Sequence, residues 1–197
     1  MRRLICLMLI TGALACKNNQ HDSVKIAKEV NRDKDKVTQT MAVEKSDADF
    51  AVEAANGNMI DVQLSALAKT KAANSRVRQF AAMIIADHAT LSSHLQQIAT
   101  DKNITLPQEL SGEAKNDITR LNRKDRATFD GAYMHMMLAD HKKYVDNFEK
   151  AAKDCKDAAL RNYIHEALPV LKKQRDSAAA IDPYFVERTP TPAPVYP

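Results

Sequence analysis

The chain has 197 residues, which is room for one domain of ordinary size with appendages at its ends. Apolar residues make up 45% of the chain and aromatic residues 5%, with 4 glycines and no tryptophan. This composition favours helices over a sheet-based core. The formal net charge of +4 is small and does not gather into a basic stripe. We therefore expect an all-α protein with no nucleic-acid partner.

The first residues have the pattern of an export signal. The positive start "MRR" precedes the apolar run "LICLMLITGALA", which is too short to span a membrane comfortably and predicts a signal peptide over residues 1–15. The small residues Ala13 and Ala15 fit an ordinary signal-peptidase site, and a cut after Ala15 would release a soluble periplasmic protein. A lipoprotein cut would instead leave Cys16 to carry a lipid anchor. We favour lipid attachment at Cys16, and an outer-membrane location because Lys17 rather than an aspartate follows the cysteine.

Low-complexity composition marks both ends of the remaining chain. Residues 16–46 are rich in charge and poor in apolar groups, so they are predicted to form a flexible, lipid-anchored tether. Residues 182–197 are rich in proline and are predicted to form a disordered tail. The folded domain is thus expected over residues 47–181.

Within that domain, caps and apolar periodicity predict four long helices. A capping box at residues 46–49, the cap "NS" at 74–75, Asp125 and Asp157 start helices that run to about residues 73, 102, 153 and 182. A short helix over 111–122 lies in the long middle connection. The segment "VRQFAAMI" at 77–84 matches "LRNYIHEA" 83 residues later, and the first and third helices match at offsets of 79 to 80. The pattern predicts an antiparallel four-helix bundle made of two related hairpins.

Each predicted helix carries one polar residue in its apolar stripe. These residues lie near the middle of their helices, so a bundle would bring them to one level: Asp61, His88, His141 and Gln174. A buried layer of this kind must be paired or must coordinate something. One interpretation is a site for a single transition metal held by Asp61, His88 and His141, with no particular metal favoured. The other, which we favour from sequence, is a hydrogen-bonded network that includes Gln174 and sets the helix register.

The neighbouring polar residues are expected to lie outside this layer. Asp87 and Asp140 lie about 100° around the helix from the adjacent histidines, so we expect them at the rim, paired with lysines. His94, His135 and His165 fall off the apolar stripes and are expected at the surface.

Four segments carry a family resemblance. The segments "DADFAVEAANGNMIDVQLSALA", "VRQFAAMIIADHATLSSHL", "YMHMMLADHKKYVDNFEKAA" and "LRNYIHEALPVLKKQ" resemble, in order and spacing, the bacterial family called domain of unknown function 4142. The resemblance covers residues 47–181 and implies a ferritin-like four-helix bundle exported to the periplasm, with no established activity. His88 and His141 match the family pattern. Asp61 stands where that pattern usually has glutamate, and Gln174 where it usually has histidine.

These observations favour a non-catalytic binding or envelope-stress module. The chain shows no nucleophile elbow, no Cys–His pair at sensible spacing and no phosphate loop, so we expect no enzyme activity. It also lacks the di-iron pattern of two glutamates with two Glu-x-x-His pairs. The alternative is a ferritin-like metal-binding protein with a site at mid-bundle. The membrane is the one partner that the sequence indicates, through the lipid anchor.

Overall fold

The computed structural model describes residues 22–182, and this part of the chain is helical with no strand. Its elements are α1 (Ser23–Asp33), a π-helical turn η1 (Lys34–Thr38), α2 (Lys45–Lys71), α3 (Ser75–Asp101), α4 (Gly112–Asn122), α5 (Phe129–Asp154) and α6 (Ala158–Ile181). None of these helices is long and apolar enough to cross a membrane. The predicted signal peptide, the predicted lipid attachment at Cys16 and the tail after residue 182 lie outside the described residues.

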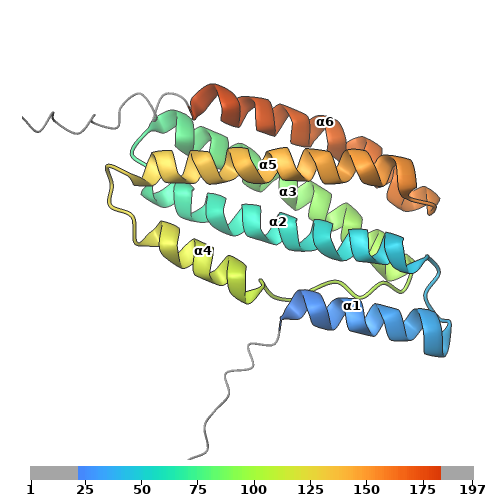
Figure 1. The fold of residues 1–197 in the computed structure, drawn as a ribbon. Helices are drawn as coiled ribbons and strands as arrows, with labels where there is room; N and C mark the ends of the chain where they lie inside the picture. The colour runs from blue at the N-terminus through green and yellow to red at the C-terminus, as the bar shows by residue number, and fades with distance from the viewer. Residues whose placement is uncertain (1–21, 183–197) are drawn as a thin grey trace, which may run out of the picture.

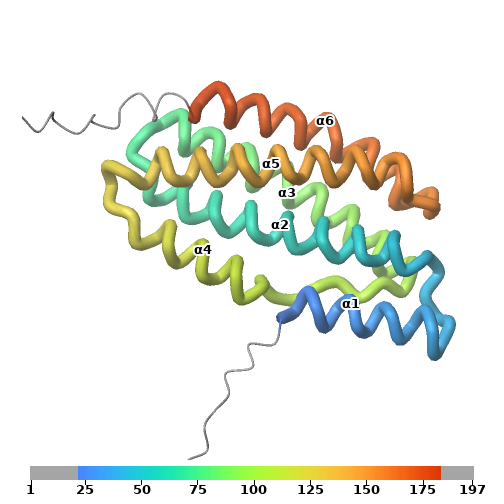
Figure 2. Tube along the Cα trace, viewed as in Figure 1, coloured from blue at the N-terminus to red at the C-terminus, as the bar shows by residue number. Residues whose placement is uncertain are grey.

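The four long helices pack side by side as two hairpins (Figures 1 and 2). Helix α2 pairs with α3 and α5 pairs with α6, while α2 also contacts α5 and α3 contacts α6. The connection that carries α4 runs back along the length of the molecule, so α5 starts at the end where α3 starts (Figure 1). The short helix predicted over 111–122 is therefore confirmed as α4, and it packs on α2 and α5.

The interior consists of two apolar clusters, one toward each end of the long helices. One contains Leu95, Leu160 and Tyr163, and the other contains Ile84, Phe129 and Tyr133. All of these side chains are at most 1% exposed. Burial of such apolar groups supplies most of the free energy that holds the helices together. The predicted polar layer lies between the two clusters.

Buried aspartates join each hairpin to the other. Asp47, in the first turn of α2, accepts hydrogen bonds from the backbone nitrogens of Lys156 and Asp157 at 3.0 and 2.8 Å. Asp130, in the first turn of α5, accepts from Ala73 and Asn74 at 3.0 and 2.7 Å. The capping box predicted at residues 46–49 is wrong, because α2 begins at Lys45 and its N-cap Glu44 makes no side-chain cap bond.

Corresponding residues in these two sets of contacts lie 83 residues apart in the chain. Asp130 corresponds to Asp47 (130 − 47), and Lys156 corresponds to Ala73 (156 − 73). Arg78 donates to the carbonyl oxygens of Ala72 and Ala73, and Arg161 donates to those of Cys155 and Lys156. The whole hairpin therefore repeats at 83, and the offset of 79 to 80 that the sequence suggested for α2 and α5 is wrong. The apolar residues recur often enough in both helices to allow a match at either spacing.

The segment predicted as a flexible tether, residues 16–46, includes α1 and η1 instead. Helix α1 packs on α2, burying Ala27 and Asn31 one helical turn apart. The Asn31 amide donates to the carbonyl oxygen of Thr105 at 2.9 Å and accepts from its backbone nitrogen at 2.7 Å. Charged residues dominate the composition of this segment, but they lie on the solvent face and hide the short buried stripe.

Candidate metal centre

The four predicted side chains meet in one layer, one from each long helix. Asp61 comes from α2, His88 from α3, His141 from α5 and Gln174 from α6, and each is at most 1% exposed. The Asp61 Oδ2 atom lies 3.6 Å from His88 Nε2 and 3.9 Å from His141 Nε2. The Gln174 Oε1 atom lies 3.2 Å from His88 Nε2 and 3.0 Å from His141 Nε2.

The outer hydrogen bonds decide which way each group faces. His141 Nδ1 lies 2.8 Å from the carbonyl oxygen of Met137. A carbonyl oxygen can only accept a hydrogen bond, so Nδ1 carries the proton of the neutral ring and Nε2 has a free lone pair. His88 Nδ1 lies 2.9 Å from Asn58 Oδ1, and the Asn58 amide nitrogen donates to Tyr163 at 3.4 Å. The same argument therefore leaves Nε2 of His88 as a lone pair.

Gln174 is oriented in a similar way. Its Nε2 donates to Asp87 Oδ2 at 3.0 Å, which turns its Oε1 toward the two imidazoles. The layer therefore presents two imidazole lone pairs, an amide oxygen and a carboxylate to one another. Neutral imidazoles in these tautomers cannot donate to an oxygen from Nε2.

Asp61 is the group that this arrangement leaves without a partner. Both of its carboxylate oxygens are buried and have no hydrogen-bond partner among the described residues. Such a group is costly unless it is paired or coordinates a cation. The predicted hydrogen-bond network thus includes the Gln174 amide, which donates to Asp87, but it supplies no donor to Asp61 among the described residues.

The spacing of the acceptors fits a metal ion. Ligand atoms of Asp61, His88 and His141 lie within 4.8 Å of one another. Metal bonds of about 2.0–2.2 Å to nitrogen and oxygen place tetrahedral ligand atoms about 3.4 Å apart. The observed separations, from 3.0 to 3.9 Å, lie on either side of that value. Outer hydrogen bonds from Asn58, Met137 and Asp87 hold the ligands in the manner usual for protein metal sites.

Burial controls the protonation of the layer. It raises the pKa of Asp61 well above its usual value, and the nearby charge of Asp140 raises it further. Burial and the neighbouring His141 lower the pKa of His88 to about 4, and burial also lowers the pKa of His141. Both imidazoles are therefore neutral and able to coordinate at pH 7, whereas Asp61 becomes an anion readily only when a cation is beside it.

Two further residues support the site. Asp87, expected at the rim beside lysines, is half-buried, and its carboxylate accepts the Gln174 amide. Asn58 was not considered, although it lies three residues before Asp61 and hence on the same face of α2. The expectation for His94 and His135 is confirmed, since their side chains are 39% and 77% exposed. His94 contacts Glu166 at 2.9 Å, and His135 lies 3.8 Å from Asp182.

Comparison with known proteins identifies the family to which this chain belongs. The family described as "Domain of unknown function (DUF4142)" matches residues 32–181, so the chain belongs to it. The match begins inside α1 and ends at the last residue of α6. No curated protein and no solved structure matches the chain.

Proposed function

We propose that this protein is a ferritin-like four-helix bundle that binds one divalent transition-metal ion in its buried layer. The ligands are the Asp61 carboxylate, Nε2 of His88, Nε2 of His141 and the Oε1 atom of Gln174. The observation that carries the proposal is the convergence of these four acceptors with no donor for Asp61. A cation provides the missing partner and neutralises the buried carboxylate.

The ligand set narrows the class of metal. Imidazole with carboxylate suits zinc, iron, copper and manganese, and the buried position disfavours strongly hydrated ions such as Mg²⁺ and Ca²⁺. Four protein ligands complete a tetrahedral shell, as is typical of structural zinc sites. The arrangement therefore supports holding or sequestering a metal more than hydrolysis at an open coordination position. The expected absence of enzyme activity stays a prediction.

Metal analysis of the untagged chain from residue 17 onward tests the proposal. We expect about one zinc, iron or manganese ion per chain after equilibration and removal of loosely bound metal. The double variant His88→Ala/His141→Ala should lose it, and Asp61→Asn should bind it more weakly. The control His135→Ala/His165→Ala removes two exposed histidines and should keep full occupancy.

Two results would contradict metal binding at this layer. One is a wild-type chain that retains no metal after equilibration. The other is a similar metal content in Asp61→Asn, the double variant and the control, which would place the bound ions elsewhere on the surface.

A further inference from the structure

The proposed ligands are closed off from solvent, so an ion needs a route to reach them. Asp61, His141 and Gln174 are 0% exposed and His88 is 1% exposed. A cavity of about 350 Å³ lies beside the layer, and its lining includes His88 together with Asn58 and Leu171. It is therefore an opening in the described part of the chain that touches a proposed ligand.

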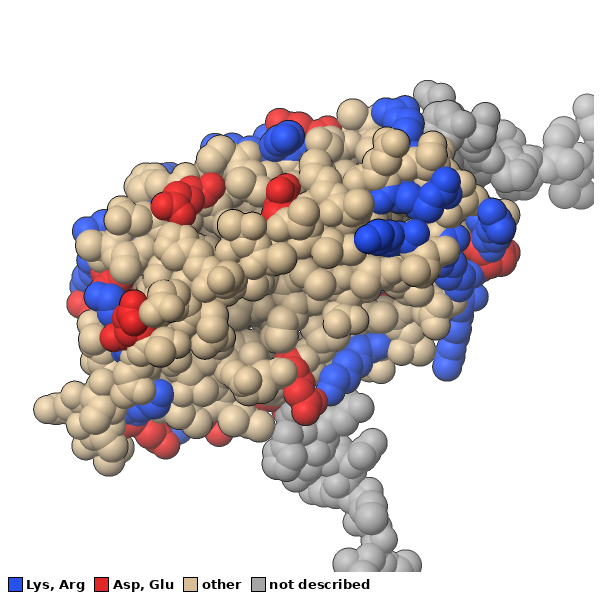
Figure 3. Space-filling view, turned by 180° about the vertical axis from the view of Figure 1, so that it is seen from behind, with Lys and Arg blue, Asp and Glu red and all other residues tan. Residues whose placement is uncertain are grey.

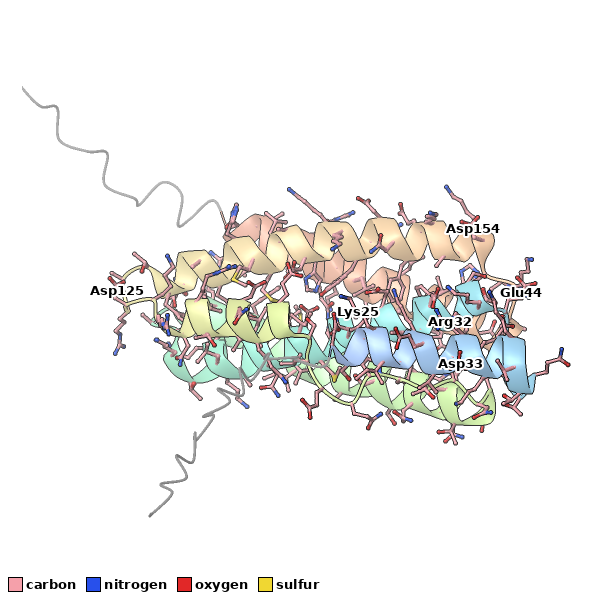
Figure 4. The ribbon with its side chains drawn as sticks, turned by 60° about the horizontal axis from the view of Figure 1, so that its bottom comes forward. Lys25, Arg32, Asp33, Glu44, Asp125 and Asp154 are labelled. Carbon is pink, nitrogen blue, oxygen red and sulfur yellow. The ribbon has the colours of Figure 1, made fainter. Side chains whose placement is uncertain are left out.

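The cavity lies on the side of the bundle where α1 and α4 pass over α2 and α5. Asp22 and Val24 at the start of α1, and Ser111 and Glu113 at the start of α4, belong to its lining. Figure 4 shows these two helices end to end across this face, with Lys25 near the inner end of α1. The facing helix ends thus frame the mouth, and the layer lies at its inner side.

Acidic side chains outnumber basic side chains in the lining of the cavity. The lining contains five acidic residues and one basic residue, Lys143. Lys28 and Arg120 partly offset two of the acids by pairing with Glu53 and Asp117. The remaining negative potential favours the approach of a cation over that of an anion.

Tyr144 is the cavity residue whose ring contacts the proposed ligand His141. Tyr144 lines the cavity, and its ring lies edge-on to the ring of His141 with centroids 5.9 Å apart. The ring approaches α2 at Gly57, where an added Cβ atom would lie 3.1 Å from the Tyr144 Cζ atom. Burial raises the pKa of Tyr144, and the charges of Asp61, Asp140 and Glu53 raise it further. The phenol is therefore close to the buried Asp61 carboxylate as well as to two acids of the cavity lining.

We propose that a divalent cation reaches the buried layer through this cavity and that the Tyr144 ring, seated over Gly57, is the gate that it passes. The proposal rests on the proposed metal site. No hydrogen bond holds the Tyr144 hydroxyl within the described residues, so the ring can swing toward the cavity without breaking one. Asp140, Glu53 and Asp61 then form a series of carboxylates along the path.

Stopped-flow absorption with Co²⁺ as the probe tests the route, because coordination by imidazole and carboxylate changes the visible spectrum of Co²⁺. Tyr144→Ala should speed Co²⁺ association and dissociation by the same factor, at least about fivefold, and leave the equilibrium spectrum and affinity unchanged. Tyr144→Phe keeps the ring and should stay within about twofold of wild type.

Phe80→Ala is the matched control, since it removes a buried ring that packs on Tyr133, away from the cavity lining. If general opening of the bundle admits the ion, this variant should accelerate uptake as much as Tyr144→Ala does, and the gate is overturned. Unchanged rates in Tyr144→Ala, or equal acceleration in Tyr144→Phe, would overturn it as well. In those cases Co²⁺ still binds with the spectrum of the buried site. A wild-type chain that binds no Co²⁺ would overturn the metal site and the route together.

Discussion

Asp61 is the residue whose surroundings define the chemistry of the layer. It faces two imidazole lone pairs and has no hydrogen-bond donor among the described residues. Burial therefore holds its pKa well above the usual value when no cation is present. If the proposed metal site is right, the carboxylate that destabilises the metal-free protein is a stabilising ligand in the metal-bound protein, so one substitution should have opposite effects in the two states.

Asp61→Asn tests this reversal. We expect the metal-free variant, in chelator at pH 7, to be more stable than wild type by about 1–3 kcal/mol, because an amide can donate to a histidine and carries no charge. The raised folded pKa makes wild-type stability fall as pH rises above the unfolded value of about 3.9, so the gain should grow above that pH. With metal the order should reverse. Urea unfolding with metal and with chelator measures the stability difference between Asp61→Asn and wild type. A variant less stable than wild type in chelator would contradict the prediction.

His88 should make the metal-free protein sensitive to acid. Its folded pKa of about 4 lies below the unfolded value of about 6.5. The contribution of the neutral ring is therefore complete above pH 6.5 and is lost as pH falls toward 4, with a total of roughly 3 kcal/mol. Urea unfolding in chelator between pH 7 and pH 4.5 should show a shallower decline for His88→Gln than for wild type. Parallel declines would count against a buried neutral His88.

At the scale of elements, the two hairpins depend on each other through one carboxylate each. Asp47 binds two backbone nitrogens of the turn before α6, and Asp130 binds two of the turn before α3. Both aspartates are nearly buried, at 2% and 4% exposure. Each therefore fixes the start of a helix that belongs to the other hairpin, and together they clamp both ends of the long helices.

Removing either carboxylate should loosen one end of the protein only. Asp47→Ala and Asp130→Ala should each lower the free energy of unfolding by about 1–3 kcal/mol, since each leaves two partly buried amides without their acceptor. Amide hydrogen exchange should quicken at residues 156–157 in the first variant and at 73–74 in the second. The exposed Asp154→Ala is the control and should change neither site. Equal acceleration at both turns in both variants would show that the clamp is not local.

At the scale of the whole molecule, the layer is asymmetric although the hairpins repeat. The offset of 83 pairs Asp61 with Tyr144 (144 − 61), His88 with Leu171 (171 − 88) and Asn58 with His141 (141 − 58). In each pair one residue is a proposed metal ligand, and the other residues, Tyr144, Leu171 and Asn58, all line the cavity together with His88. Figure 3 shows the molecule from behind the view of Figure 1, and on this face the charged side chains lie mostly toward the margins of the view.

Attachment to a membrane is a prediction for the whole chain, because Cys16 lies outside the described residues. We expect a fatty-acid label to mark the wild-type protein in cells and not Cys16→Ser. The physical reason is that the acyl chains, attached through the Cys16 residue, are the groups that enter the bilayer. Equal labelling of both chains would contradict lipid attachment and favour the ordinary signal-peptide cut. Lys17→Asp, which changes the residue that bears on sorting, should keep the label.

The sequence determined the helical class, the long helices and the four residues of the layer, because apolar periodicity follows from helix geometry alone. It also indicated the family through the four matching segments. Helix α1 was missed because Ala27 and Asn31 show their burial only when α2 and Thr105 are in place. The 83-residue offset in α2 and α5 needed the contacts of Asp47 and Asp130 to resolve it.

Only the tertiary structure decided the chemistry of the layer. Periodicity placed Asp61, His88, His141 and Gln174 at one level, but it could not say which atoms face inward. That depends on partners from other turns and helices, namely Asn58, the Met137 carbonyl and Asp87. Hydrogen bonding is directional, so these contacts leave four acceptors facing one another, which is the arrangement on which the proposed metal site rests.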